Sequence, residues 1–366
     1  MSEIELNPQF LHALDLMKNG EGSVFITGRA GTGKSTLLQY FKKHTEKNIV
    51  ILAPTGVAAV NIGGATIHSF FTFKPDITME KAWKLGGKAK KPELYKKLDA
   101  IVIDEISMVR ADLLDCVDAF MRRVCGTMAP FGGKRVIMFG DLYQLPPVVT
   151  RDDRDIFSSR YDSAFFFSAD VISRTPLTFI ELDHIYRQSD DEFIKILNAI
   201  RENKASAKDI STLNTRVNED YAPPPEEYVI HLTGTNRDAE SYNIYQLNSL
   251  GGEVFIFKAS STGSFDKRTE PAPRELTLKI GAQVMMTSND REKRFINGTV
   301  GRIEDISEVD GSPVVSVRLH NKKLVDVGPN SWEMFKFNYS EKSRRITTEV
   351  AGTYTQLPLM LAWGIT

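Results

Sequence analysis

The stretch SVFITGRAGTGKSTLLQYFKKH, from Ser23 to His44, gives the clearest indication of the fold class. It starts with an apolar run as long as a strand, passes through a glycine-rich loop and continues with the spaced apolar residues of an amphipathic helix. The loop, GRAGTGKS from Gly28 to Ser35, has the phosphate-loop pattern of two glycines followed by Gly-Lys-Ser. Backbone N–H groups of such a loop and of the following helix terminus bind phosphate oxygens. The stretch therefore predicts a nucleotide site between a strand and a helix.

Two side chains of this loop are expected to act on the nucleotide. Lys34 would reach the β and γ phosphates, and the hydroxyl of Ser35 would bind Mg²⁺. A glycine-rich turn before a helix, without any ligand, is the alternative interpretation. We expect nucleotide contacts at Gly28, Ala30, Gly31, Thr32, Gly33, Lys34, Ser35 and Thr36.

A second apolar run, AIVIDEISM from Ala100 to Met108, ends in two adjacent carboxylates. Asp104 would hold Mg²⁺, directly or through water, and Glu105 would orient and deprotonate the water that attacks the γ-phosphate. Charges that only cap a strand are the alternative. A protein that merely binds ATP has little use for the second carboxylate, so the pair favours hydrolysis with ATP and Mg²⁺ as cofactors.

Short Val/Ile/Leu/Phe runs alternate with helix-like segments such as ADLLDCVDAFMRRV through the first two hundred residues. This alternation predicts an α/β domain with a parallel sheet covered on both faces. The alternation of strand-like and helix-like segments starts again with YVIHLTGTN and RDAESYNIYQLNSL. This predicts a second α/β domain beyond Lys204. Closely spaced strand-like segments beyond Gly281 predict a small β-barrel inserted into that second domain.

The composition is that of an ordinary globular protein, with 366 residues of which 42% are hydrophobic and 25% charged. A formal net charge of −1 means that any polyanion site has to be local, and residues 81–97 carry seven lysines against one glutamate. Cys116 and Cys125 lie in one helix-like stretch and are expected to be packing residues. No apolar run approaches the ~18 residues that cross a bilayer, and no targeting signal is seen, so we expect an intracellular protein, cytoplasmic or in the nucleoid, with no membrane partner.

A third motif, MFGDLYQLPP from Met138 to Pro147, leaves another apolar strand and places an uncharged amide, Gln144, after it. Gln144 as a solvated loop residue is one interpretation. However, ligands of parallel sheets bind at the carboxyl ends of the strands. An amide there can bond the γ-phosphate or the attacking water without adding charge, so we predict that Gln144 senses the γ-phosphate.

Several segments in one order carry a resemblance to a known family: GRAGTGKSTLL, APTGVAAVNIGGATIHSFF, IVIDEISMV, FGDLYQLPPV and ELDHIYRQSDDEFIKILNAIR. The sequence resembles the petite-integration-frequency (Pif-type) DNA helicases, in class B of helicase superfamily one and related to RecD-type enzymes. The resemblance begins at LNPQF and spans essentially the whole chain. It implies two RecA-like P-loop domains, residues 1–203 with a small insertion at about 70–97, and residues 204–366. The second would be incomplete at its C-terminal end and carry a Src-homology-three-like barrel at about 299–355.

The same resemblance implies ATP-driven 5′-to-3′ translocation on single-stranded DNA by a monomer. It implies unwinding of 5′-tailed duplexes or G-quadruplexes in DNA repair, recombination and telomere maintenance. By similarity, Gln9 would contact adenine and Arg187 would reach the γ-phosphate as an arginine finger. A guanidinium can stabilise charge on the transferring phosphoryl group, although a surface salt bridge is the alternative for Arg187. The expected catalytic residues are Lys34, Glu105, Gln144 and Arg187.

The resemblance also implies contacts with nucleic acid in both domains. Backbone groups and a hydroxyl at the start of a helix suit a phosphate, and His68 would lie beside the strand, unless it is a hydrogen-bonded core histidine. The aromatic residues Phe70 and Phe71 are expected in the core rather than stacked on bases. The expected DNA-binding residues are Thr55, Gly56, Val57, His68, Thr233, Thr235 and Asn236.

Two alternatives stay open. The printed sequence ends at LPLMLAWGIT without residues like the later family motifs, so a nucleotide-gated single-stranded DNA-binding protein with impaired unwinding is one alternative. An RNA-directed motor is the other, because phosphate contacts do not distinguish the sugar.

Overall fold

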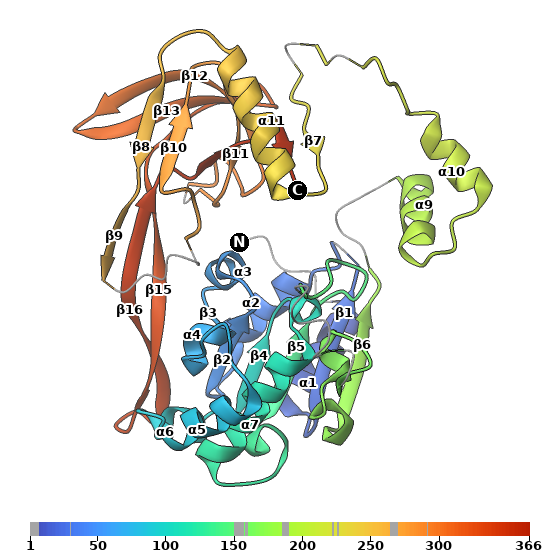
Figure 1. Cartoon of the computed structure of the whole chain (residues 1–366), viewed down its shortest axis with the longest axis vertical. Helices are drawn as coiled ribbons and strands as arrows, with labels where there is room; N and C mark the ends of the chain where they lie inside the picture. Colours follow the sequence, from blue (N-terminus) through green and yellow to red (C-terminus); the bar gives the residue numbers. More distant parts are fainter. Residues whose placement is uncertain are drawn as a thin grey trace. The chain divides into compact units, whose positions relative to one another are not determined.

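The computed structural model describes residues 7–29, 31–149, 157, 160–184, 190–221, 223–224, 227–263, 270–290 and 292–366 (Figure 1). The chain forms two compact units. The first comprises Met1–Val217 and Phe335–Glu349, and the second comprises Asn218–Met334 and Val350–Thr366. Within the described ranges, every helix is too short or too polar to reach across a bilayer.

The first unit is built on a six-stranded sheet in the order β3-β2-β4-β5-β1-β6. All five strand pairs are parallel, with Phe25 opposite Met138 and Ile51 opposite Val102 as examples of the register. The carboxyl ends of the strands therefore meet at one edge of the sheet. The strands are β1 (Ser23–Gly28), β2 (Ile49–Ala53), β3 (Ala65–Thr66), β4 (Ala100–Ile103), β5 (Arg135–Phe139) and β6 (Leu177–Leu182).

Both faces of this sheet are apolar and covered by helices (Figure 1). Neighbouring residues of a strand point to opposite faces, so Val24 and Ile26 of β1 pack in one cluster and Phe25 in the other. This explains why the central strands are continuous apolar runs. One face carries α1 (Pro8–Asn19), α2 (Lys34–His44) and α3 (Gly56–Asn61). The other carries α4 (Ile67–Phe71), α5 (Met79–Gly87), α6 (Pro92–Lys96) and α7 (Ala111–Cys125).

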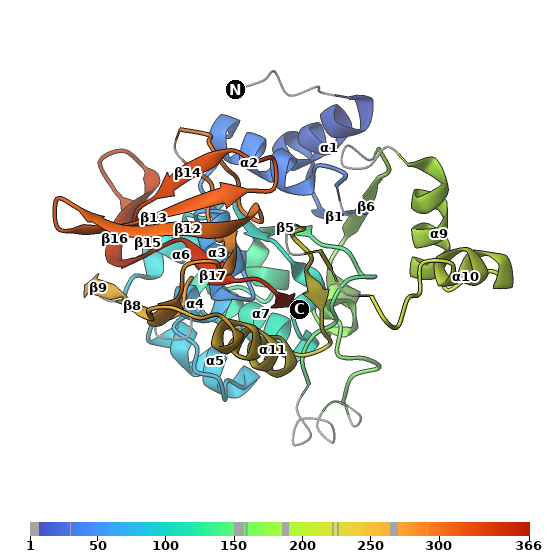
Figure 2. The same ribbon diagram turned by 90° about the horizontal axis from the view of Figure 1, so that it is seen from above.

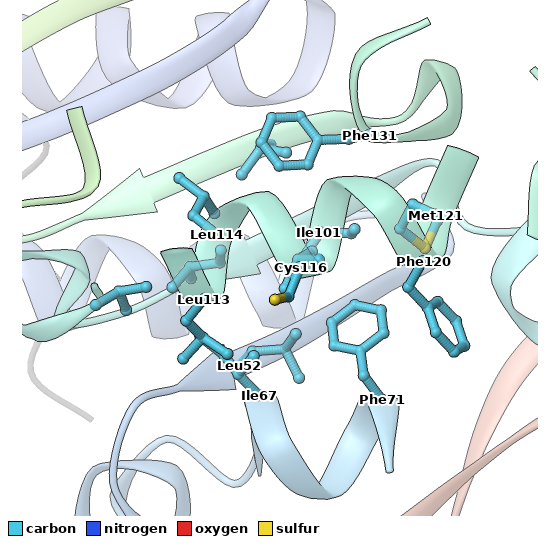
Figure 3. Packing of buried hydrophobic residues seen from close by; sticks show 14 of the residues in the cluster. Leu52, Ile67, Phe71, Ile101, Leu113, Leu114, Cys116, Phe120, Met121 and Phe131 are labelled. Carbon is cyan, nitrogen blue, oxygen red and sulfur yellow. The ribbon is translucent and has the colours of Figure 1, made fainter. Parts of the chain in front are cut away.

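The larger core cluster lies between α7, α4 and the sheet (Figure 3). Phe71 and Phe120 are buried and meet edge to face with ring centroids 5.2 Å apart. The helix predicted around the two cysteines is confirmed as α7, and neither cysteine forms a disulfide. Burial raises the pKa of Cys116 to about 12, so this thiol is a packing group, as expected.

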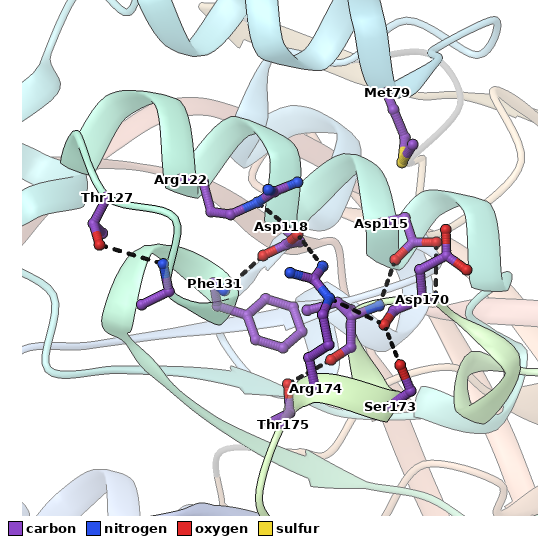
Figure 4. Close-up of polar contacts among 12 residues, drawn as sticks. Met79, Asp115, Asp118, Arg122, Thr127, Phe131, Asp170, Ser173, Arg174 and Thr175 are labelled. Atoms are coloured by element: carbon purple, nitrogen blue, oxygen red, sulfur yellow. Dashed lines mark hydrogen bonds and ion pairs between the residues drawn. The ribbon is translucent and has the colours of Figure 1, made fainter.

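A buried carboxylate on α7 ties it to the segment before β6 (Figure 4). Asp115 accepts hydrogen bonds from the hydroxyl of Tyr161 at 2.9 Å and from the backbone N–H groups of Asp170 at 3.0 Å and Val171 at 2.9 Å. Burial raises the pKa of Asp115, while these donors oppose the shift. A buried acid with three donors is a structural anchor rather than a free reactive group.

The remaining described helices of the first unit are the short 3-10 helices η1 to η4 and the α-helices α9 and α10. Within the described ranges, α9 and α10 lie next to each other in two views (Figure 1 and Figure 2). The segment DEFIKILNAIR, quoted above for the family resemblance, forms α9. The bounds are η1 (Ile106–Met108), η2 (Pro130–Gly133), η3 (Phe166–Ser168), η4 (Ile172–Arg174), α9 (Asp191–Arg201) and α10 (Ala207–Asn214).

Among its described residues, the second unit combines one helix, a parallel strand pair and antiparallel sheets. The helix predicted over RDAESYNIYQLNSL is α11 (Asn236–Ser249), and β7 (His231–Leu232) pairs in parallel with β18 (Gly364–Ile365). The strand-like segments beyond Gly281 form a five-stranded sheet in the order β14-β13-β12-β11-β17. Its strands are β11 (Gln283–Met286), β12 (Val300–Val309), β13 (Ser312–Leu319), β14 (Leu324–Val327) and β17 (Leu359–Leu361).

Two smaller sheets complete the described strands. One pairs β10 (Glu275–Leu278) with β8 (Phe255–Lys258). The other has the order β15-β16-β9, with β15 (Asn330–Ser340), β16 (Arg345–Gln356) and β9 (Ser260–Gly263). The ends of β15 and β16, together with their connection, belong to the first unit.

Candidate functional site

The glycine-rich loop has the strand–loop–helix setting that its sequence predicts. It follows β1 and ends at Gly33, which caps α2 with φ 87°, in the left-handed region where a residue with a Cβ is strained. The buried hydroxyl of Thr32 donates to the carbonyl oxygen of Arg29 at 2.9 Å and closes the turn. The first N–H groups of α2 consequently lie at the end of the loop. Ala30 lies outside the described residues.

Lys34 lies folded over this loop. Its Nζ donates to the carbonyl oxygens of Gly28 at 2.5 Å and Arg29 at 3.1 Å. Burial lowers the pKa of Lys34, and nearby Asp141 and Glu105 oppose that shift. A half-buried ammonium held by two carbonyl groups is well placed to exchange one of them for a phosphate oxygen.

The two carboxylates predicted at the end of β4 lie side by side. The backbone N–H of Glu105 donates to Asp104 Oδ1 at 3.0 Å, and Glu105 itself has φ 51°, in the left-handed region. Burial raises the pKa of both groups, and the charge of Asp104 raises that of Glu105 further. A cation bound beside these partly buried carboxylates would offset the cost of burying their charge. Ser35 is exposed in the first turn of α2.

The loop after β5 brings an aspartate and the predicted sensor to the same region. Asp141 is buried and accepts from the backbone N–H of Tyr143 at 3.1 Å. Gln144 is exposed, and its Nε2 donates to Asp141 Oδ2 at 3.3 Å. An added Cβ on Gly140 would lie 2.9 Å from Ile106, so a glycine lets this loop pass against the segment after β4.

These groups form one cluster of interacting charges. The pKa of Lys34 responds to the charges of Asp141, Glu105, Arg201 and Asp104. Lys34, the two carboxylates and Asp141 follow the carboxyl ends of β1, β4 and β5, and Arg201 is the last residue of α9. The structure places all of them around the glycine-rich loop. Sequence reasoning missed Asp141 and Arg201, although an aspartate directly after a buried strand was an available signal.

The structure describes one of the two remaining predicted nucleotide contacts, Gln9, and not the other, Arg187. Gln9 lies in the first turn of α1, and its Oε1 accepts from the backbone N–H of Asp183 at 3.3 Å, just beyond β6. Gln9 thus lies at the same edge of the sheet as the glycine-rich loop. Arg187 lies outside the described residues, so the arginine-finger role stays a prediction.

The predicted nucleic-acid contacts of the first unit lie on α3 and α4. Thr55 caps α3 and accepts from the N–H of Ala58 at 3.3 Å, and Val57 is exposed. His68 is partly buried on α4. Phe70 and Phe71 are 7% and 0% exposed, which confirms that they are core residues rather than stacking platforms.

The predicted contacts of the second unit cluster at the start of α11. The hydroxyl of Thr233 donates to the carbonyl oxygen of Thr235 at 3.0 Å. Thr235 caps the helix, donating to Asp238 Oδ2 at 2.7 Å. Asn236 Oδ1 accepts from the hydroxyl of Thr366 at 2.7 Å. These groups form an exposed polar turn, and their contact with DNA stays a prediction.

Fold and site together define the class of this protein, an α/β protein with a P-loop nucleotide site. A family model described as PIF1-like helicase matches residues 9–211. ATP-dependent DNA helicase Pif1 of Bdellovibrio bacteriovorus is 33% identical over 375 residues, which cover 100% of this chain and 79% of that protein. ATP-dependent DNA helicase RRM3 of Saccharomyces cerevisiae is 32% identical over 82% of this chain and 42% of that protein. The chain belongs to the PIF1-like helicase family.

The fold is shared with solved structures of Pif1 from Bacteroides sp. Its complex with ADP-AlF4 has a TM-score of 0.90 and 34% identity, and the match covers 100% of this chain and 83% of that one. A second Bacteroides structure, bound to single-stranded DNA, has a TM-score of 0.62 at 34% identity. The predicted fold class is thereby confirmed.

Proposed function

We propose that this chain hydrolyses ATP and uses the energy to move 5′ to 3′ along single-stranded DNA and unwind duplexes. The observation that carries the proposal is the charge cluster around the glycine-rich loop, in which Lys34 interacts with Asp104, Glu105 and Asp141. Curated relatives named ATP-dependent DNA helicases support the same activity. The polarity and the use of G-quadruplexes rest on the family resemblance.

In this proposal Lys34 leaves its backbone acceptors and binds the β and γ phosphates. Glu105 takes the proton of the attacking water. Its pKa is raised by burial and by Asp104, and a more basic carboxylate is a better proton acceptor. Gln144, anchored on Asp141, bonds the γ-phosphate or the water. Arg187 would add positive charge to the transferring group.

Asp104 and Ser35 would hold Mg²⁺. They fit the ion because the carboxylate lies in a negatively charged, partly buried cluster and the hydroxyl lies at the start of α2. When bound, the ion supplies positive charge to the β and γ phosphate oxygens.

For the DNA, we propose contacts at the starts of α3 and α11. Thr55, Gly56 and Val57 present a helix start with an exposed side chain in the first unit. Thr233, Thr235 and Asn236 present a polar turn in the second. Hydroxyl, amide and N–H groups of this kind bind phosphate and sugar oxygens, which suits contact along a strand without reading its sequence.

Steady-state ATP hydrolysis with and without single-stranded DNA tests the proposal. We expect DNA-stimulated turnover that Lys34→Ala abolishes, because the ammonium that would bind the β and γ phosphates is lost. Glu105→Gln should lower kcat by about 10²-fold or more while ATP still binds, because the base is lost but the phosphate contacts remain. Full turnover in either variant would contradict the assigned role. Absence of DNA stimulation would favour a nucleotide-gated DNA-binding protein.

A further inference from the structure

The loop that carries Gln144 is held in place by contacts with α9, whose catalytic consequence rests on the proposed ATPase function. Gln144 is exposed and follows the end of β5 by only a few residues. Its side chain is anchored through Nε2 to Asp141 Oδ2. Whatever holds Asp141 therefore sets where the amide of Gln144 lies.

Arg201, the last residue of α9, contacts this loop from a position 60 residues further along the chain. Its guanidinium donates to Asp141 Oδ1 at 2.8 Å, while Gln144 occupies the other carboxylate oxygen. The side chains of Arg201 and Asp141 are 15% and 3% exposed, so the charge pair is largely shielded from water. Such a shielded pair holds its two side chains together, because separating them would leave a buried charge without a partner.

The same guanidinium lies over the ring of Tyr143, with Cζ 4.3 Å from the ring centroid. Tyr143 lies two residues after Asp141 and directly before Gln144, and it is largely exposed. Arg201 thus contacts the loop at two residues, Asp141 through a charged hydrogen bond and Tyr143 through a cation–π contact.

A second contact connects the same end of α9 to the glycine-rich loop. Glu202, the residue after Arg201, accepts from Arg29 at 3.4 Å, and both side chains are 31% exposed. This pair is more open to water and contributes less than the shielded one. It offers a matched control, since it joins α9 to the nucleotide site without touching Asp141.

We propose that Arg201 is a positioning residue for ATP hydrolysis: by holding Asp141 and Tyr143 it places the Gln144 amide at the γ-phosphate. Arg201 does not itself contact the nucleotide in this proposal. It acts only through Gln144, which separates it from an arginine finger. Losing it should lower kcat and leave ATP binding nearly unchanged, because Lys34 and the glycine-rich loop remain intact.

The test compares Arg201→Gln, Gln144→Ala and the double variant in the whole chain with saturating single-stranded DNA. We expect Arg201→Gln to lower kcat by about 10²-fold with KM for ATP changed less than about threefold, as for a displaced catalytic group. Adding Arg201→Gln to Gln144→Ala should cause no further loss, because both remove the same interaction. Glu202→Gln should stay within about threefold of the unmodified chain.

If Arg201→Gln does not fold, the pair Asp141→Asn with Arg201→Gln removes both buried charges together and keeps the test available. It should fold and still show the low kcat. The inference would be overturned if Arg201→Gln, or the Asp141→Asn/Arg201→Gln double variant, kept the kcat of the unmodified chain. It would also be overturned if Arg201→Gln lowered kcat by the same factor in the unmodified chain and in the Gln144→Ala variant. Failure of the proposed function is distinguishable, because the unmodified chain would then show no ATP turnover that depends on Lys34.

Discussion

At the scale of single residues, the candidate nucleotide site consists of side chains placed just beyond strand ends. Lys34 follows the loop after β1, Asp104 and Glu105 follow β4, and Asp141 follows β5. Parallel strands bring these positions to one edge, and burial then strengthens the interactions between their charges. The backbone matters equally, because Gly33 has to take up a left-handed conformation where α2 begins.

The glycine at this position predicts a specific effect of substitution. Gly33→Ala places a Cβ on a residue with φ 87° and should cost about 1–2 kcal/mol of strain at the loop. We expect weaker ATP binding, because relief of this strain moves the N–H groups that face the phosphates. Binding of a fluorescent ATP analogue measures the change.

Gly126→Ala is the matched control. Gly126 has φ 69° at the end of α7, and an added Cβ would meet nothing within 4 Å. It should destabilise the fold by a similar amount and leave ATP affinity unchanged. Equal losses of affinity in the two variants would show that the strain acts through overall stability instead of through the loop.

At the scale of elements, α7 is attached to its surroundings by buried carboxylates as well as by apolar packing (Figure 4). Asp118 accepts from the backbone N–H of Phe131 at 2.7 Å and pairs with Arg122 at 2.8 Å. Its second oxygen also meets Arg174 at 3.3 Å. Asp118 is 2% exposed, so these partners replace water around its charge.

Removing this carboxylate should therefore be costly. Asp118→Ala should lower the free energy of unfolding of the first unit by about 3–5 kcal/mol, because Arg122 and a backbone N–H lose a buried partner. Arg174→Ala is the control and should cost below about 1 kcal/mol, because the arginine is 44% exposed.

The measurement is urea unfolding followed by tryptophan fluorescence. The chain has three tryptophans, and Trp83 lies on α5 in the first unit, with Arg122 5.9 Å from its ring centroid. Replacing Trp332 and Trp363 by Phe makes the signal report the first unit. Equal losses in the two variants would refute the anchoring role of Asp118.

At the scale of the whole molecule, the chain passes between the two units three times, at 217/218, 334/335 and 349/350. The short segment that returns to the first unit packs there by aromatic and polar contacts. Phe337 meets Phe70 with ring centroids 5.6 Å apart, and Asn48 donates to the carbonyl oxygen of Arg344 at 3.1 Å. Sequence position alone would have assigned this segment to the second unit.

Translocation polarity is a property of the whole molecule and can be tested with tailed duplexes. We expect strand displacement from a 5′ single-stranded tail and none from a 3′ tail, with Lys34→Ala inactive on both. Displacement from the 3′ tail alone would contradict the proposed polarity. Competition between DNA and RNA oligonucleotides of one sequence decides whether the sugar is distinguished, because phosphate contacts alone do not do so.

Local sequence patterns were enough to predict the main elements and the motifs of this protein. The glycine-rich loop, the carboxylate pair and the apolar strands follow from local spacing, and β1, α2, β4 and α7 lie where their patterns predict. Contacts between residues far apart in the sequence became visible in the folded chain alone. The contact between Asp141 and Arg201, the partners of Asp118 and the packing of Phe337 join segments whose pairing no local period specifies. The physical reason is that periodicity tells which face of an element is apolar, whereas the strand order and the close packing of the core decide what lies against it.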